Sequence, residues 1–157
     1  MLSAELAALF ARDLARLIQE LQAFPDTASV WKTAPGVSNA AGTLALHLEG
    51  NLREYIGRQI ARIPFERDRP LEFSARGVSQ SDLIERLEAV KAAIPPVIAA
   101  LTESQLDARY PEQVLGHPMS TRQFLLHLEA HLNYHLGQVD YLRRFVTGDG
   151  AIDLAGL

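Results

Sequence analysis

Four long stretches of this sequence repeat their apolar residues with the period of an α-helix, and this pattern limits the possible folds more than any other feature. No stretch alternates with the two-residue period of a half-buried strand. In a chain of 157 residues, four amphipathic helices favour one all-α domain, a four-helix bundle that spans residues 1–157. The helices are expected from Ser3 to about Phe24, from Ser38 or Thr43 to about Ile63, from Ser79 to about Leu101, and from Thr121 to about Val146. Ser3, Ser79 and Ser120 are the expected N-caps of the first, third and fourth helices.

Proline and glycine mark expected interruptions and ends of these helices. Pro95 and Pro96 are adjacent within the third helix and must kink or break it, because neither can donate a backbone hydrogen bond. Gly148 is expected to close the last helix. The charged segment from Phe65 to Val78 is predicted to be irregular, and residues Thr102 to Met119 are predicted to form a connection with at most one short helical turn.

Composition excludes several classes of function. The net charge is −4 and no basic stripe is present, whereas a nucleic-acid binder needs clustered Lys and Arg. The chain has no cysteine, which excludes disulfides, zinc-thiolate sites and a Cys nucleophile, and suits a reducing cytoplasm. No apolar run is long enough for a membrane span or resembles a signal peptide. We therefore expect a soluble cytoplasmic protein that contacts neither nucleic acid nor membrane.

The histidines carry the strongest indication of chemistry. His131 and His135 lie four residues apart in the last predicted helix, about 40° apart around its axis, and both face the buried stripe. This spacing lets two imidazoles share one metal ion. His47 is the only histidine of the second helix and also faces the predicted core, so the three rings offer three nitrogen ligands and leave a position for water or substrate. The alternative is that each ring is a hydrogen-bonded core residue, and spacing alone leaves both interpretations open.

Polar residues near these histidines are candidates for supporting roles. Asn51 follows His47 by one turn, His127 precedes His131 by one turn, and Gln138 lies three residues after His135; ordinary packing roles remain equally open for them. The segment HLNYH lacks the glutamate of a metalloprotease HExxH helix, and neither Glu129 nor Asp140 points toward the histidines, so peptidase activity is not expected.

The connection before the third helix contains a run of charged residues. We interpret the charge run from Arg67 to Arg69 as solvated, with a role in binding an anionic substrate as the alternative.

Two of the predicted helices and the charged loop resemble the DinB/YfiT-like family of metalloenzymes. The last helix contains HLEAHLNYHLGQVDYLRR, which is similar to the family's pattern of a histidine followed four residues later by His-x-Gly-Gln. The second contains SNAAGTLALHLEGNLREYI, which resembles the family's metal-binding histidine helix, and RDRPLEF resembles a loop of an uncharacterised branch. The similarity extends from Trp31 to Val146.

The resemblance implies a four-helix bundle with up-down-down-up connectivity, often a homodimer, and a nickel or zinc site carried by His47, His131 and His135. Some relatives are S-transferases that use bacillithiol or mycothiol. The expected function is thus a metal-dependent transferase that activates an exogenous low-molecular-weight thiol and acts on a small-molecule substrate. The alternatives are a non-catalytic metal-binding stress-response protein and a metal-dependent hydrolase of unknown substrate.

Overall fold

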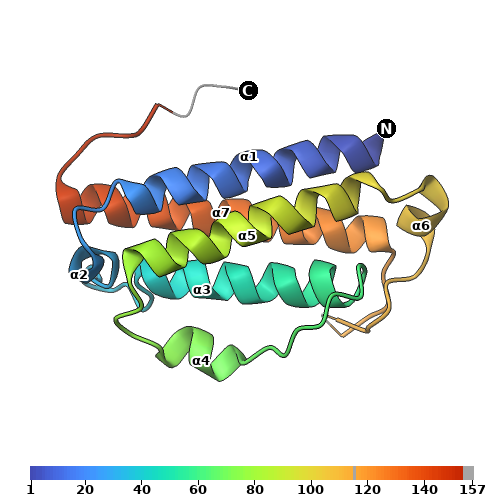
Figure 1. Ribbon diagram of the computed structural model, residues 1–157, viewed down its shortest axis with the longest axis horizontal. Helices are drawn as coiled ribbons and strands as arrows, with labels where there is room; N and C mark the ends of the chain where they lie inside the picture. Colours follow the sequence, from blue (N-terminus) through green and yellow to red (C-terminus); the bar gives the residue numbers. More distant parts are fainter. Residues whose placement is uncertain (115, 154–157) are drawn as a thin grey trace.

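All regular elements that the structure describes are helical. A computed structural model describes residues 1–114 and 116–153 (Figure 1), and the prediction of an all-α chain is confirmed over these ranges. The elements are α1 (Leu2–Gln22), α2 (Thr27–Val30), α3 (Ala41–Leu52), the π-helix η1 (Arg53–Arg58), α4 (Arg69–Ser74), α5 (Gln80–Ala99), α6 (Glu103–Asp107) and α7 (Thr121–Thr147).

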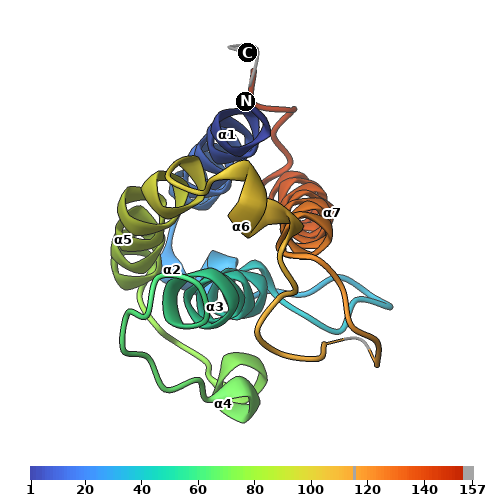
Figure 2. The same ribbon diagram turned by 90° about the vertical axis from the view of Figure 1, so that its right-hand side faces the viewer.

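Four long helices lie side by side and enclose the core. Helix α1 packs against α5 and α7, and α3 packs against the same two helices from the other side. Figure 2 shows this square arrangement nearly end on, with α4 outside it next to α3. In Figure 1, α1 and α7 run from right to left, and α3 and α5 run from left to right.

Local capping explains where α5 and α7 begin and where α7 ends. The Ser79 and Ser120 side chains accept hydrogen bonds from the backbone N–H groups three residues ahead, as predicted for α5 and α7. Gly148 ends α7 with a φ of 78°, a left-handed conformation that glycine adopts without a steric penalty. The prediction that Ser3 caps the first helix is wrong, because α1 already begins at Leu2 and Ser3 is buried inside it.

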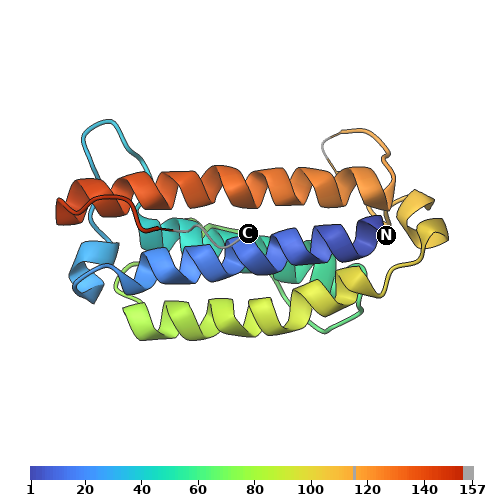
Figure 3. The ribbon, with the colours of Figure 1, turned by 90° about the horizontal axis from the view of Figure 1, so that it is seen from above.

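The adjacent prolines do not break α5. Pro95 and Pro96 both lie within the helix, which continues to Ala99. Their missing N–H groups would have bonded the carbonyls of Lys91 and Ala92, which lie in a partly exposed stretch where water can take over. The axis of α5 bends in this part of the helix (Figure 3). The predicted interruption is therefore a bend without a break.

The segment from Phe65 to Val78 was predicted to be irregular, and this is wrong for its centre. Residues Arg69–Ser74 form helix α4, which Asp68 caps by accepting from Leu71 N at 2.9 Å, with Pro70 in the first turn. Helix α4 packs against α3. This short helix lies outside the four-helix arrangement but faces the helix that carries His47.

The core is formed by apolar side chains from all four long helices. Leu14, Leu48, Leu87 and Leu132 represent these helices, and each is fully buried. A buried ion pair also joins the first and last helices, where Arg143 Nε lies 2.8 Å from Glu20 Oε2. None of the helices described is long and apolar enough to cross a membrane.

Candidate metal centre

The three predicted histidines meet between α3 and α7, two long helices that pack side by side (Figure 2). His47 is buried in the middle of α3, and His131 and His135 lie half-buried on adjacent turns of α7. The four-residue spacing places both α7 rings toward α3, as the helical geometry predicts. The structure therefore brings together the residues that the sequence singled out.

The facing ring nitrogens are close enough to share an ion. His131 Nε2 lies 3.2 Å from His47 Nε2 and 3.1 Å from His135 Nε2. One nitrogen from each ring lies within 4.8 Å of the other two. Nitrogens bound tetrahedrally at about 2.0–2.1 Å from a zinc ion would be about 3.3 Å apart. The cluster can therefore hold one divalent metal ion through three imidazoles.

The acceptor atoms beside the outer nitrogens indicate which ring atoms carry protons. His47 Nδ1 donates to Glu72 Oε2 at 3.0 Å, and His135 Nδ1 donates to Gln138 Oε1 at 2.6 Å. A neutral imidazole has one proton, so both Nε2 atoms present lone pairs toward His131. A single N–H on His131 cannot donate to both of them. A cation between the three rings would satisfy all these lone pairs, and this donor set fits a metal ion.

Burial keeps two of these rings neutral. Desolvation, reinforced by repulsion from His135 and His47, lowers the pKa of His131 to about 4. Desolvation also lowers the pKa of His135, although the hydrogen bond with Gln138 opposes this shift. Neutral imidazole is the form that binds metal, so both rings are ready to bind at neutral pH.

Sequence reasoning missed Glu72, which lies on α4 and is buried against His47. Its carboxylate also accepts from Arg67, with Nε to Oε1 at 2.6 Å and Nη2 to Oε2 at 2.9 Å. Burial opposes ionisation, but the hydrogen bonds from His47 and Arg67 lower the pKa of Glu72 below its ordinary value. An ionised carboxylate that orients a metal-binding histidine is a common partner in such sites.

Two signals in the sequence could have indicated this contact. Asp68 followed by Pro70 marks a helix start, which would have predicted α4. Gly50 lies where a Cβ atom would collide with the carboxyl group of Glu72, so its presence allows α4 to approach α3 closely. The interpretation of the charge run as solvated is wrong for Arg67, whose side chain is only 11% exposed.

The other candidate residues differ in their relation to the cluster. Gln138 contacts His135, as described. His127 is exposed on α7, and its ring is stacked 6.3 Å from that of His131. Asn51 is 8% exposed, and its Oδ1 atom is buried without a hydrogen-bond partner among the residues described. Glu129 points away from the histidines and shares a hydrogen bond with Asp13 of α1.

Comparison with known proteins agrees with this fold. The family model described as the DinB superfamily matches residues 9–139, a range that includes all three histidines. The crystal structure of a DinB-like protein from Bacillus cereus superposes with a TM-score of 0.67, covering 89% of this chain and 91% of that chain at 21% sequence identity. At this identity the similarity shows the fold alone. No curated protein matches the chain.

Proposed function

The chain belongs to the DinB superfamily, and we propose that it binds one nickel or zinc ion through the Nε2 atoms of His47, His131 and His135. The observation that carries this proposal is the convergence of the three nitrogens while the outer nitrogens of two rings donate to Glu72 and Gln138. Without a cation, the lone pairs inside the cluster have too few donors.

We further propose that the protein is a transferase that activates a low-molecular-weight thiol of the bacillithiol or mycothiol type. Three protein ligands leave a coordination position open. A bound divalent ion would stabilise a thiolate near neutral pH. Since the chain has no cysteine, the thiol comes from outside. Glu72 and Gln138 hold two of the imidazoles in their ligating orientation and leave their Nε2 atoms unprotonated.

A homodimer in the cytoplasm is the proposed working form. Three aromatic side chains on α7, Tyr134, Tyr141 and Phe145, are each more than 60% exposed. Exposed aromatic side chains are typical of protein–protein interfaces. Light scattering after size-exclusion chromatography should give twice the 17.3 kDa chain mass, and a mass of one chain would reject the dimer.

Calorimetric titration with zinc and nickel tests the metal site. We expect one ion per chain in the parent protein, loss of tight binding in His135→Ala, and unchanged binding in His117→Ala, since His117 lies in an exposed connection outside the cluster. Equal binding by all three proteins would reject the ligand set.

Turnover of electrophiles by the metal-loaded protein, with and without bacillithiol or mycothiol, tests the transferase. No thiol-dependent turnover in a broad panel would favour the non-catalytic alternative, in which the ion serves to join α3 and α7.

A further inference from the structure

A cavity of about 300 Å³ beside the histidine cluster has a positively charged lining. His47 lines it from α3 and His131 from α7, while Arg67 and Arg69 line it from the segment where α4 begins. No aspartate or glutamate of the described residues is among its lining residues, although the chain as a whole has a net charge of −4. A molecule in this cavity would lie beside the proposed metal ion, in surroundings that favour an anion.

The two arginines of the lining differ in whether their charge is already paired. Arg67 donates two hydrogen bonds to the Glu72 carboxylate, 2.6 and 2.9 Å long, and its side chain is only 11% exposed. Arg69 is exposed, and no carboxylate of the described residues lies within ion-pair distance of it. Arg69 therefore has a guanidinium group free to bind a carboxylate of a ligand.

The ring of Phe73 connects Arg69 with the histidine cluster. Arg69 and Phe73 lie one turn apart on α4, and the guanidinium carbon is 5.1 Å from the centre of the ring, a cation–π contact. The centre of the same ring lies 4.9 Å from that of the His47 ring. A ligand group that pairs with Arg69 is thus held near an imidazole that offers one of the three metal-binding nitrogens.

Aromatic side chains form another part of the wall. Tyr55, Phe124 and His127 line the cavity, with ring centres 5.2 Å apart for the first two and 5.9 Å apart for the last two. Aromatic rings bury methylene groups favourably. The cavity therefore offers an apolar surface to the stem of a ligand as well as a cation to its charged end.

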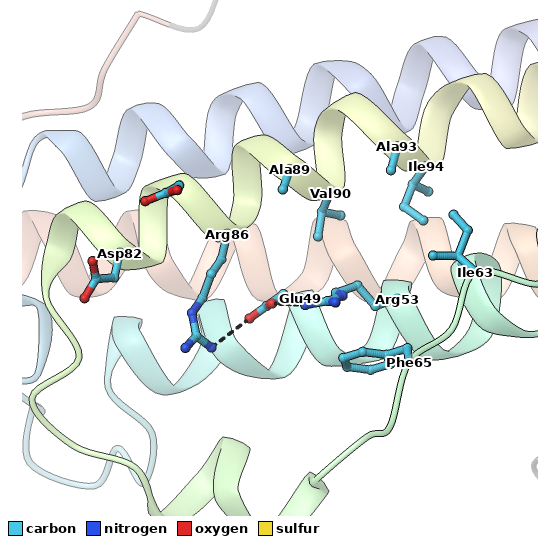
Figure 4. A pocket seen from close by; sticks show the side chains of 12 residues that line it. Glu49, Arg53, Ile63, Phe65, Asp82, Arg86, Ala89, Val90, Ala93 and Ile94 are labelled. Atoms are coloured by element: carbon cyan, nitrogen blue, oxygen red, sulfur yellow. Dashed lines mark hydrogen bonds and ion pairs between the residues drawn. The ribbon is translucent and has the colours of Figure 1, made fainter.

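A larger cavity lacks this free charge. It measures about 530 Å³ and lies between α3 and α5, and none of its described lining residues is a histidine (Figure 4). Its buried carboxylate, Glu49, pairs with Arg53 at 2.9 Å and with Arg86 at 3.4 Å. Both arginines of that lining are thus already engaged, so an anion has less reason to bind there.

We propose that the smaller cavity binds the thiol, with the sulfur toward the three histidines and a carboxylate of the same molecule on Arg69. Arg69 is then the residue that selects a thiol carrying a carboxylate over a neutral one. Binding in this way releases the proton of the S–H group to the solvent and breaks no other bond. This inference rests on the proposed transferase function, and it adds the chemical class of the thiol.

Titration of the nickel-loaded protein with two matched thiols tests the inference, with the sulfur-to-nickel charge-transfer absorption as the readout. The probes are 6-mercaptohexanoate and 6-mercaptohexanol, which have the same chain length and differ in the charge of the far end. Their length disfavours chelation of one ion by both ends of the molecule. At low ionic strength we expect the carboxylate probe to bind about three- to fivefold more tightly, the size of one partly exposed ion pair. High salt should reduce this preference by screening.

Variants at exposed positions identify the residue responsible. In Arg69→Gln the preference for the carboxylate probe should disappear, while affinity for 6-mercaptohexanol and for nickel stays at the parent value. Arg69→Lys keeps the positive charge and should keep most of the preference. Arg109→Gln removes the same charge at an exposed position that does not line the cavity, and should behave like the parent.

Nickel affinity is measured first in every protein, so that the proposals fail separately. Absence of nickel binding in the parent would overturn the proposed metal site. Nickel binding without a charge-transfer band for either thiol would overturn the proposed thiol activation and the inference with it. A band of equal affinity for both thiols would overturn the inference alone. A preference that survives unchanged in Arg69→Gln would also overturn it, because another group would then bind the carboxylate.

Discussion

Each histidine of the cluster has a different environment at its outer nitrogen. His47 donates to a carboxylate, His135 donates to an amide oxygen, and the Nδ1 atom of His131 is buried without a hydrogen-bond partner among the described residues. The partner of a metal-binding imidazole sets its orientation and its basicity. The three rings are therefore expected to contribute unequally to metal affinity.

Of the residues that accept hydrogen bonds from the outer nitrogens of the histidines, Glu72 should affect metal binding most when it is changed. In Glu72→Gln the buried negative charge that accepts from His47 is lost, and Arg67 loses its ion-pair partner. We expect zinc affinity at pH 7.5 to fall about 10- to 100-fold. The exposed neighbour Glu66 provides the control, since Glu66→Gln removes the same charge outside the cluster. Equal affinities in the two variants would exclude a supporting role for Glu72.

The number of protons released on metal binding reports the lowered pKa values directly. Three ordinary imidazoles would be mostly protonated at pH 5.5 and would release nearly three protons per ion. The pKa of His131 is lowered to about 4, and that of His135 is also lowered. We therefore expect fewer than two protons to be released per ion. Calorimetry in buffers of different ionisation enthalpy measures this number, and a value close to three would contradict the burial of these rings.

At the level of elements, the close approach of α4 to α3 depends on one glycine. A side chain at position 50 would occupy the space of the Glu72 carboxyl group. That group is the far end of a flexible side chain, so it can move away without unfolding the protein. The packing of a short outer helix is thereby linked to the orientation of His47.

Gly50→Ala should therefore weaken metal binding more than it affects folding. We expect zinc affinity to fall by about tenfold or more, because the carboxylate is displaced from His47. Gly137→Ala is the matched control, as a Cβ there meets no atom within 4 Å on the exposed side of α7. It should leave affinity unchanged and raise the free energy of unfolding by about 0.5–1 kcal/mol. Parent-like zinc affinity in Gly50→Ala would refute the link.

At the scale of the whole molecule, α7 joins two regions with different roles. Toward α3 it presents the histidines, and toward α1 it presents buried polar groups that include Arg143 and Glu129. Burial, together with the hydrogen bond and the negative charge of Asp13, raises the pKa of Glu129 to about 8. The folded protein thus keeps a carboxyl group protonated at neutral pH between its first and last helices.

This carboxyl group should make stability depend on pH. The unfolded chain releases the proton near pH 4.5 and the folded chain near pH 8, so in between the folded state binds more protons. The free energy of unfolding therefore falls as the pH rises through this range. Glu129→Gln should not show this decrease. At pH 8 its free energy of unfolding should therefore be about 1–2 kcal/mol higher than that of the parent.

Urea denaturation of chelator-treated protein at pH 5, 6.5 and 8 measures the effect. The lowered pKa values of His131 and His135 make the free energy of unfolding rise with pH below about pH 6.5. Both proteins share this contribution, so it cancels in the comparison. Glu88→Gln, at a half-exposed position of α5 where only the surface ion pair with Lys91 is lost, should change the free energy of unfolding by less than about 0.5 kcal/mol. Parallel pH profiles for the parent and Glu129→Gln would show that Glu129 is ionised in the folded state.

Local patterns were sufficient to predict four long helices and the shared face of His131 and His135. These features depend on spacing within one helix and on caps such as Ser79 and Ser120, which act on backbone groups three residues away. The predicted third and fourth helices accordingly match α5 and α7 to within about two residues at each end. The second helix is the exception in its bounds, because it changes to the π-helix η1 after Leu52 and ends at Arg58, before the predicted Ile63. Pro95 and Pro96 show the limit of such local rules, since the surrounding helix continues through them.

The distribution of polar residues around the cluster depends on contacts between helices, which local patterns do not specify. Glu72 lies 25 positions from His47 in the sequence and reaches it because a short helix folds back over α3. Among the three residues proposed for support, Gln138 contacts a ring nitrogen. The His127 ring is stacked 6.3 Å from that of His131, and Asn51 is buried with its Oδ1 atom unpaired among the described residues. Periodicity can assign a side chain to a face of its own helix, but contacts between helices depend on how those faces pack together.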